Sequence, residues 1–479
     1  MASTPQPDLA LPAFFQDLAS IVGTQHVLTE PADTAPFFTD WRRVFPGTGI
    51  GAVRPANTDE VSRVVALCAK HGVSVVPQAG NTSLCGGSVP RATGAGAVPE
   101  LVVSVARLNR IRSMDPLNDT MTVEAGCILQ TLQKAADAEN RLFPLSLAAE
   151  GSCQIGGNLS TNAGGVGVLR YGNARDLVLG LEVVLPDGRV WDGLKALRKD
   201  NTGYELKHLF MGAEGTLGVI TAAVLKLFPK PSSATTAWIA VENPQRAVEL
   251  LAALRSLMGD RLTAFELISR VCLDSVIKCK PTILDPLRDR HPWYVLCELT
   301  DGGTQEALNA RAEAALMECT ERGILIDVAL AQSETQSNAL WSIRETIPEA
   351  QFTNVKHDVS VPVSSIALMI DEGMAELTQA FPGCVGFIFG HIGDGNLHYN
   401  IGMGDEESTQ AFMKNLKAVN EIVYKVVDRL GGSISAEHGV GQLKRESIKP
   451  RKSAVELELM QRVKDALDPQ GIMNPGKVL

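Results

Sequence analysis

The sequence predicts an α+β protein with more than one domain. Its 479 residues exceed what a single compact core usually holds. Segments with helical periodicity and short β-like runs occur in both halves of the chain. The polar stretch from Lys230 to Ser233 separates the halves and has the composition of a linker. We therefore expect two α+β units in sequence order.

Each half contains recognisable elements. Apolar side chains recur at helical spacing from Val61 to Cys68, between Thr58 as candidate N-cap and Gly72 as candidate exit. Other elements of this half are strands at 73–77, 101–105, 121–124 and 181–185 and a β-rich run at 218–228. In the second half we expect helices at 246–258 and 304–321, a strand at 293–299, and a turn at 474–477 after a final helical run.

Composition excludes several classes of protein. A net charge of −10 argues against nucleic acid or an anionic membrane surface as the main partner. No apolar run approaches the ~20 residues of a membrane-spanning helix, and residues 1–19 do not resemble a signal peptide. The nine cysteines are scattered and form no CxxC pair, which favours reduced thiols and a cytoplasmic location.

Three glycine-rich elements in the first half predict a phosphate-binding cradle. The loop at 77–88 leaves a predicted strand and combines glycines with hydroxyl side chains, so that backbone N–H groups can surround a pyrophosphate. Alone this loop is equally consistent with a simple turn. Similar elements at 151–165 and 212–220 favour a cradle. Neither a Walker lysine loop nor a strand-linked GxGxxG is present, which disfavours ATP and a Rossmann-bound nicotinamide.

With these elements, residues 46–231 resemble an FAD-binding domain of the vanillyl-alcohol oxidase type, a two-part α+β fold. The resemblance implies that the first loop wraps the FAD diphosphate, the second runs toward the isoalloxazine, and the third contacts the adenine side. Members with covalent FAD often carry a histidine where this chain has Asn81, so non-covalent FAD is expected. The implied cofactor-lining residues are Pro77, Gly80, Asn81, Thr82, Ser83, Gly86, Gly87, Gly151, Gly157, Thr161, Asn162, Gly164, Gly165, Glu214 and Ile220.

The second half contains two histidine motifs that predict a metal site. His391 and His398 flank a Gly-Asp-Gly-Asn turn, and Glu437 immediately precedes His438 in the stretch SAEHGVG. Histidines seven residues apart point to opposite faces of a straight strand, but a bend at 393–396 would direct both to one centre. Two histidines and a glutamate can hold a divalent ion with open positions for substrate, zinc or alternatively manganese. The alternative for any one histidine is an ordinary core or surface residue.

HxGDGNxH and SAEHGVG resemble the C-terminal domain of the FAD-linked D-2-hydroxy-acid dehydrogenases, and the combined resemblance covers about 46–479. It implies His391, His398 and Glu437 as metal ligands and His438 as the base that takes the hydroxyl proton while a hydride passes to flavin N5. Asn474, in the final turn, is expected to return toward the flavin. The implied domains are an arm at 1–45, the FAD domain at 46–231, a substrate or cap domain at 232–425, and a C-terminal helical segment at 426–479.

The resemblance also implies that Arg344, Lys356 and Asn400 bind substrate. A guanidinium can hold a carboxylate through two parallel hydrogen bonds, although a solvated helix surface also explains Arg344. Pro348 stands where similar dehydrogenases carry a substrate-contacting threonine. D-2-hydroxyglutarate is the favoured substrate, with D-lactate, D-malate or glycolate as alternatives.

Two other classes of function compete with this interpretation. One is a metal-free flavin oxidase, and the other is a non-catalytic FAD-binding subunit of a larger complex. The implied partners are a small 2-hydroxy acid and an electron acceptor such as an electron-transfer flavoprotein or a quinone, and a homodimer is common among similar proteins. No sequence motif identifies the acceptor.

Overall fold

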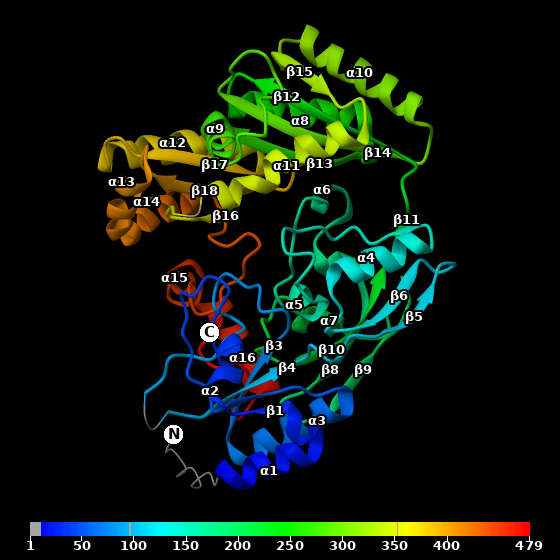
Figure 1. Ribbon diagram of the computed structural model, residues 1–479, viewed down its shortest axis with the longest axis vertical. Coiled ribbons are helices and arrows are strands. Elements are labelled where there is room, and N and C mark those ends of the chain that lie inside the picture. Colours follow the sequence, from blue (N-terminus) through cyan, green and yellow to red (C-terminus); the bar gives the residue numbers. More distant parts are fainter. Residues whose placement is uncertain (1–10, 95–96, 352) are drawn as a thin grey trace. The chain divides into compact units, whose positions relative to one another are not determined.

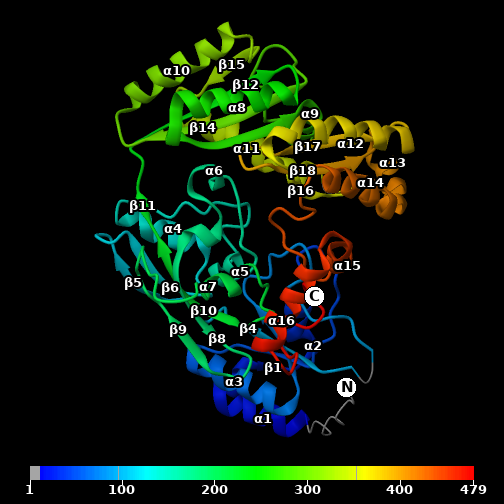
Figure 2. The same ribbon diagram turned by 180° about the vertical axis from the view of Figure 1, so that it is seen from behind.

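The computed structural model describes residues 11–94, 97–351 and 353–479. Its contacts divide the chain into two compact units (Figures 1 and 2). Unit 1 comprises Met1–Ala163, Asn173–Pro229 and Glu437–Leu479, and unit 2 comprises Gly164–Gly172 and Lys230–Ala436. The prediction that residues 1–19 lack a signal peptide falls partly on residues 1–10, which lie outside the described residues. Among the described helices, none combines the length and apolarity of a membrane span.

Unit 1 contains two main sheets. The first has the order β1 (Val27–Leu28), β2 (Gly51–Val53), β4 (Glu100–Ser104), β3 (Ser74–Gln78), with β2, β4 and β3 parallel. The second is antiparallel, with the order β5 (Ile111–Asp115), β6 (Thr120–Glu124), β10 (Val219–Lys226), β8 (Val178–Val184), β9 (Val190–Gly193). A short ribbon pairs β7 (Arg141–Leu142) with β11 (Phe228–Pro229). The helices are α1 (Leu11–Val22), α2 (Pro31–Phe38), α3 (Thr58–His71), α4 (Leu129–Ala138), α5 (Ile155–Ser160), α7 (Lys207–Phe210), α15 (Arg445–Ile448) and α16 (Ala454–Leu467).

The start of α3 corrects one prediction. The N-cap is Asn57, whose side chain accepts the Glu60 backbone N–H at 2.9 Å, and not Thr58. The Thr58 hydroxyl instead donates to Glu182 of β8 at 2.6 Å. Asn57 and Thr58 both have side chains that can cap a helix, but the Thr58 hydroxyl is hydrogen-bonded to a carboxylate on a distant strand. Gly72 ends the helix as predicted, with φ of 66°.

Unit 2 is built on one antiparallel seven-stranded sheet. Its order is β15 (Asp327–Leu330), β12 (Ser233–Val241), β14 (Trp293–Asp301), β13 (Leu262–Ser269), β17 (Val385–His391), β18 (Asn396–Gly402), β16 (Asp358–Ser360). The helices are α6 (Val168–Tyr171), α8 (Pro244–Met258), α9 (Arg270–Cys279), α10 (Gln305–Glu321), α11 (Glu334–Ala350), α12 (Ile366–Ala380), α13 (Glu406–Phe412) and α14 (Leu416–Arg429). Separate α-helical and β-rich layers in both units confirm the predicted α+β class.

The core of unit 2 fixes which sheet face carries α9 and α11. Trp238, Ile268 and Tyr294 project from three neighbouring strands into one buried cluster, together with apolar residues of α9 and α11. Side chains alternate between the two faces of a strand. The neighbouring residues of these strands therefore lie on the opposite face of the sheet, where α8 and α10 pack (Figure 2). This arrangement matters for the site, because strand residues that pair with members of this cluster lie on the same sheet face, the one that α9 and α11 cover.

Candidate active site

The three glycine-rich elements of unit 1 lie together. A Cβ on Gly80 would come within 2.5 Å of the Ser152 carbonyl oxygen, and the Glu214 backbone N–H donates to the Ser160 carbonyl at 2.8 Å. The first loop therefore contacts the second, and the second contacts the third. Only glycine fits at position 80, because any side chain would collide with the neighbouring backbone.

This cradle fits a diphosphate-bearing cofactor. Within the described residues, the backbone N–H groups of Thr82, Ser83 and Leu84 donate no hydrogen bond. In the second loop, the side-chain oxygens of Gln154 and Asn158 are buried without a hydrogen-bond partner among the described residues. Clustered donors suit phosphate oxygens, and buried polar atoms of this kind suit a bound ligand.

Several predicted cofactor residues are held by the protein itself. The Asn81 amide donates to the Thr39 carbonyl at 2.9 Å and its oxygen accepts the Ser88 hydroxyl at 2.8 Å. The Asn162 side chain accepts the Arg175 backbone N–H at 2.9 Å. Asn81 and Asn162 both have positive φ, so these asparagines shape the loops.

The remaining predicted cofactor residues lie in loops, strands and helix α5 of unit 1, apart from two glycines. Gly164 and Gly165 are grouped with unit 2, whereas Gly151, Gly157 and Thr161 stay with unit 1. The other predicted cofactor residues lie in or beside the strands, turns and glycine loops of unit 1. They are Pro77, Thr82, Ser83, Gly86, Gly87, Glu214, Ile220 and Asn474.

Strand register brings the two histidines of unit 2 onto one sheet face. His398 of β18 is the direct partner of Phe389 in β17, and His391 lies two residues beyond Phe389 on the same face. The ring centroids of His391 and His398 are 5.8 Å apart, and one ring nitrogen of each lies within 4.8 Å of the other. The bend predicted at 393–396 is thus the turn of a β-hairpin.

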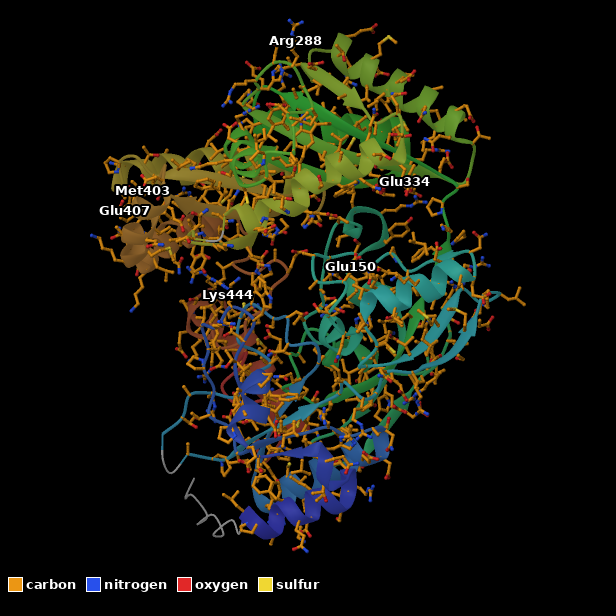
Figure 3. The ribbon with its side chains drawn as sticks, in the orientation of Figure 1. Glu150, Arg288, Glu334, Met403, Glu407 and Lys444 are labelled. Carbon is orange, nitrogen blue, oxygen red and sulfur yellow. The ribbon has the colours of Figure 1, made fainter. Side chains whose placement is uncertain are left out.

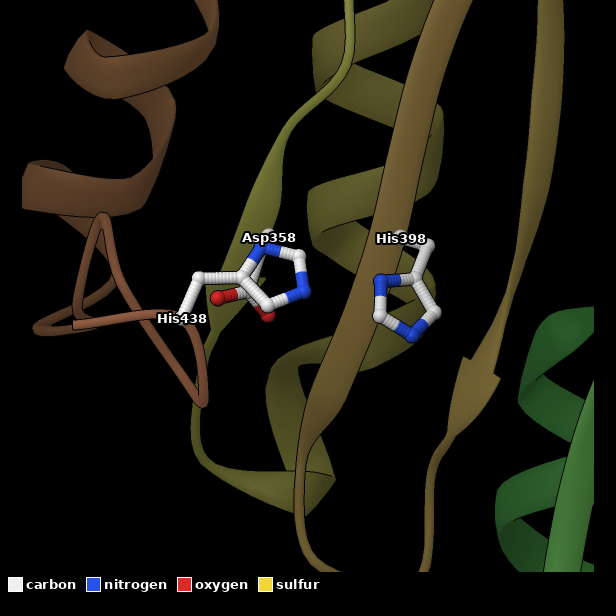
Figure 4. Close-up of side chains that lie close together, drawn as sticks. All are labelled: Asp358, His398 and His438. Carbon is white, nitrogen blue, oxygen red and sulfur yellow. The ribbon is translucent and has the colours of Figure 1, made fainter. Parts of the chain in front are cut away.

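The Gly-Asp-Gly-Asn turn also has a clear structural reason. Gly395 has φ of 90°, and a Cβ there would lie 2.3 Å from the Val361 carbonyl oxygen. The Asn396 backbone N–H donates to Asp394, while its side-chain amide donates to Asp358 of β16 at 3.0 Å. The turn therefore holds the hairpin against β16. Asp358 pairs in register with His398, and Figure 4 shows both side chains.

A buried glutamate that sequence reasoning missed orients His391. Glu266 of β13 is the cross-strand partner of His391, and its Oε1 accepts a hydrogen bond from His391 Nδ1. Its Oε2 accepts from Arg344 Nε at 2.7 Å. Burial by itself raises the pKa of Glu266, but His391 and Arg344 outweigh it and lower the pKa to about 2. No motif marks Glu266, because its partners lie about 80 and 125 residues away.

The bond to Glu266 occupies Nδ1 of His391, so Nε2 is the ring nitrogen with which this residue could bind a metal ion. A carboxylate on the other ring nitrogen is the usual support of a metal-bound histidine, since it fixes the tautomer and the ring direction. His391 and His398 therefore suit two positions in the shell of a divalent ion. Arg344 NH2 lies 3.5 Å from the same Nε2.

The three predicted substrate residues all belong to unit 2. Arg344 of α11 is buried, and its guanidinium lies 4.8 Å from the ring centre of Phe389. Asn400 of β18 is buried and donates to Gln351 Oε1 at 3.3 Å, whereas Lys356 is exposed. Pro348 lies one helical turn after Arg344 on the same face of α11 and supplies no hydroxyl.

Glu437 and His438 follow directly on a segment that is fixed within unit 2. Ser433 and Ser360 of β16 exchange two backbone hydrogen bonds, of 2.8 and 2.9 Å. The Ala436 backbone N–H then donates to the Asp358 carbonyl at 3.3 Å. Glu437 and His438 are the next two residues and begin the last segment of unit 1. The residues directly before this pair are therefore held by β16 of unit 2.

Comparison with solved structures defines the fold. The chain superposes on p-cresol methylhydroxylase with a TM-score of 0.76 at 17% identity, covering 99% of this chain and 98% of that one. It superposes on 4-ethylphenol oxidase from Gulosibacter chungangensis with a TM-score of 0.73 at 16% identity, covering 100% and 98%. The protein has the vanillyl-alcohol oxidase/p-cresol methylhydroxylase fold, with an FAD-binding domain and a cap domain.

Sequence comparison defines the family. Residues 230–478 match the C-terminal domain of FAD-linked oxidases, and residues 50–193 match an FAD-binding domain. The mitochondrial D-2-hydroxyglutarate dehydrogenase of Arabidopsis thaliana is 38% identical, over 96% of this chain and 80% of that protein. D-2-hydroxyglutarate dehydrogenase of Xanthomonas citri pv. viticola is 38% identical over 96% of both. A putative mitochondrial D-lactate dehydrogenase of Schizosaccharomyces pombe is also 38% identical, over 94% and 85%.

This chain therefore belongs to the family of FAD-linked D-2-hydroxy-acid dehydrogenases. It is an enzyme of the FAD-dependent dehydrogenase and oxidase type.

Proposed function

We propose that the protein oxidises D-2-hydroxyglutarate to 2-oxoglutarate, with non-covalent FAD as hydride acceptor and one divalent metal ion, zinc or manganese. The observation that carries the proposal is the pair of imidazoles on one sheet face, with Nδ1 of His391 hydrogen-bonded to buried Glu266. In this proposal His391, His398 and Glu437 hold the metal. When bound, the metal polarises the substrate's hydroxyl and carboxylate and FAD accepts the hydride.

The chain's own residues then have distinct roles. His438, which follows Glu437 directly, accepts the hydroxyl proton on one ring nitrogen, and the N–H of the other ring nitrogen can orient the ring. Arg344 binds a substrate carboxylate. Of the five N–H donors of the Arg344 guanidinium, Glu266 accepts only the one on Nε, and this contact holds the guanidinium in place. Glu266 is thus expected to orient both a metal ligand and a substrate-binding cation.

The choice of D-2-hydroxyglutarate rests on the relatives and on further polar side chains of unit 2. Two relatives that carry this substrate in their names match nearly the whole chain. In this proposal Lys356 and Asn400 bind the distal carboxylate, Asn400 by exchanging its 3.3 Å bond to Gln351 for one to substrate. Non-covalent FAD is supported by Asn81, which offers no nucleophilic side chain. The electron acceptor, a homodimer and a cytoplasmic location stay predictions.

D-lactate is the second candidate substrate, and one observation favours it. Pro348 supplies no hydroxyl on the face of α11 that carries Arg344, so a distal carboxylate would have one donor fewer. The relative from Schizosaccharomyces pombe is named for D-lactate.

Anaerobic mixing of the FAD-loaded protein with single 2-hydroxy acids tests the proposal. We expect D-2-hydroxyglutarate to bleach the flavin absorbance fastest, and L-2-hydroxyglutarate to leave it oxidised. Faster bleaching by D-lactate, D-malate or glycolate would contradict the substrate assignment. Absence of bleaching by every acid would contradict the proposed reaction.

A further inference from the structure

Glu214 occupies an unusual place in unit 1. It lies in the turn before β10, with φ of 51°, and its side chain is buried. Its backbone N–H donates to the Ser160 carbonyl of the second glycine loop at 2.8 Å. A non-glycine residue with positive φ is uncommon, so the turn is held by its surroundings.

Both carboxyl oxygens of Glu214 accept hydrogen bonds from the backbone of the SAEHGVG segment. Oε1 accepts the Val440 backbone N–H at 2.6 Å, and Oε2 accepts the Gly441 backbone N–H at 2.8 Å. A Cβ on Gly439 would lie 2.8 Å from Glu214 Oε1, so glycine is required for this close approach. These amides come two and three residues after His438. Each of these hydrogen bonds restrains the backbone N–H that donates it.

The same residue is linked to the first glycine loop and to the C-terminal turn. The Asn474 side-chain amide donates to the Glu214 carbonyl at 2.7 Å and to the Gly87 carbonyl at 2.9 Å. Gln442 donates from its side chain to the Gly86 carbonyl at 2.8 Å. Lys444, labelled in Figure 3, continues the segment by donating its backbone N–H to the Val440 carbonyl at 3.0 Å.

We propose that Glu214 is a positioning residue for His438: it fixes the backbone after the base by binding the Val440 and Gly441 amides. The inference rests on the proposed function, in which His438 accepts the substrate proton. It assigns the Glu214 side chain to the base-bearing segment and leaves the backbone of its turn to the cofactor cradle. The FAD loops and the segment that carries the base then form one hydrogen-bonded set.

Glu214→Gln in the full-length, FAD-loaded protein tests this role. The amide keeps one acceptor but presents an NH2 group to a backbone N–H, so at least one of the two bonds is lost. We expect hydrogen exchange of peptides covering 437–444 to accelerate by about tenfold or more at Val440 and Gly441. The rate constant of flavin reduction should fall by a similar factor, with KM and FAD content little changed.

Glu124→Gln is the matched control. Glu124 is a buried carboxylate of the same unit that pairs with Arg110 and Arg112 and accepts no bond from the 437–444 segment. We expect it to leave exchange at 437–444 and the reduction rate at parental values. Gly439→Ala serves as a second test if Glu214→Gln fails to fold, because it disturbs the same contact with Glu214 intact. It should accelerate exchange at Val440 and Gly441 too.

The outcomes separate this inference from the proposed function. Unchanged exchange at Val440 and Gly441 in both variants would overturn the positioning role, and so would faster exchange with a parental reduction rate. Loss of FAD with a normal rate per bound flavin would overturn it in favour of a cofactor contact. The proposed function is tested in parallel by His438→Ala, which contains intact Glu214.

Discussion

The candidate site of unit 1 is built mainly from backbone groups, whereas that of unit 2 is built from side chains. In unit 1 the cradle is made of backbone: glycines permit close approach, as at Gly80, and the N–H groups of Thr82 and Ser83 are available to a ligand. In unit 2 the site is made of side chains that strand register brings together, as with His391 and His398. Backbone sites are visible in sequence as glycine motifs, whereas side-chain sites depend on which strands pair. We therefore expect single substitutions of the reacting or ligand-binding side chains to lower activity more than single substitutions in the backbone cradle.

The largest effect is expected at His438. His438→Ala removes the proton acceptor, so the rate constant of flavin reduction by D-2-hydroxyglutarate should fall by about 10²- to 10⁴-fold, as measured by anaerobic stopped flow. The protein should stay yellow, because the cradle of unit 1 is made by other residues. His208→Ala, at a surface histidine of unit 1, should reduce at the parental rate. A parental rate in His438→Ala would refute the assignment of the base.

Glu266→Gln should weaken metal binding. The amide cannot replace a carboxylate that accepts from both His391 and Arg344, so the imidazole loses its fixed tautomer and direction. We expect metal affinity to fall by about 10- to 100-fold, measured by competition with a chromophoric chelator.

Glu298→Gln provides the control, since Glu298 is also a carboxylate of the same sheet but accepts from Trp341 and Thr263. Equal metal loss in both variants would show that Glu266 has no special part in the metal site.

Arg344→Lys should separate binding from chemistry. Lysine keeps the charge but cannot make the fixed pair of contacts to Glu266 and to a substrate carboxylate. We expect KM for D-2-hydroxyglutarate to rise by about tenfold or more. Reductive titration at several substrate concentrations checks this. An unchanged KM would place the carboxylate-binding group elsewhere.

The smallest effect compares the two units through equivalent helix caps. Asn57 caps α3 in unit 1 and Asn243 caps α8 in unit 2, each by accepting a backbone N–H three residues on, at 2.9 and 3.0 Å. Either Asn→Ala change should lower the free energy of unfolding of its unit by about 1 kcal/mol, measured by urea denaturation. Asn→Asp at either position keeps the acceptor and should cost less. An Asn57→Ala protein as stable as the parent would contradict the cap assigned to α3.

Much of the fold could be predicted from local signals. The apolar spacing from Val61 to Cys68 located α3, and the predicted strands at 101–105 and 121–124 differ from β4 and β6 by one residue at most at either end. The cap of α3 could not be chosen, because Asn57 and Thr58 both have capping side chains and the choice depends on Glu182 of another strand. Local sequence therefore locates elements better than it resolves contacts between distant residues.

The same limit applies to the site. HxGDGNxH marked the two histidines, because the turn and both ligands lie within eight residues. Glu266 is hydrogen-bonded directly to His391, yet it was missed because strand pairing alone makes the two residues neighbours. The resemblance placed Glu214 on the adenine side, and its contact with Val440 and Gly441 emerges only from the folded chain.

Metal dependence of flavin reduction, measured in one preparation, tests the proposed metal chemistry most directly. Metal is removed from the FAD-loaded protein by a chelator, flavin bleaching by D-2-hydroxyglutarate is measured anaerobically, and Zn²⁺ or Mn²⁺ is then added back. We expect bleaching to be lost with the metal while FAD stays bound, and to return when the ion is restored. Bleaching at the parental rate in metal-free protein would contradict the proposed metal chemistry and would favour a metal-free flavin oxidase.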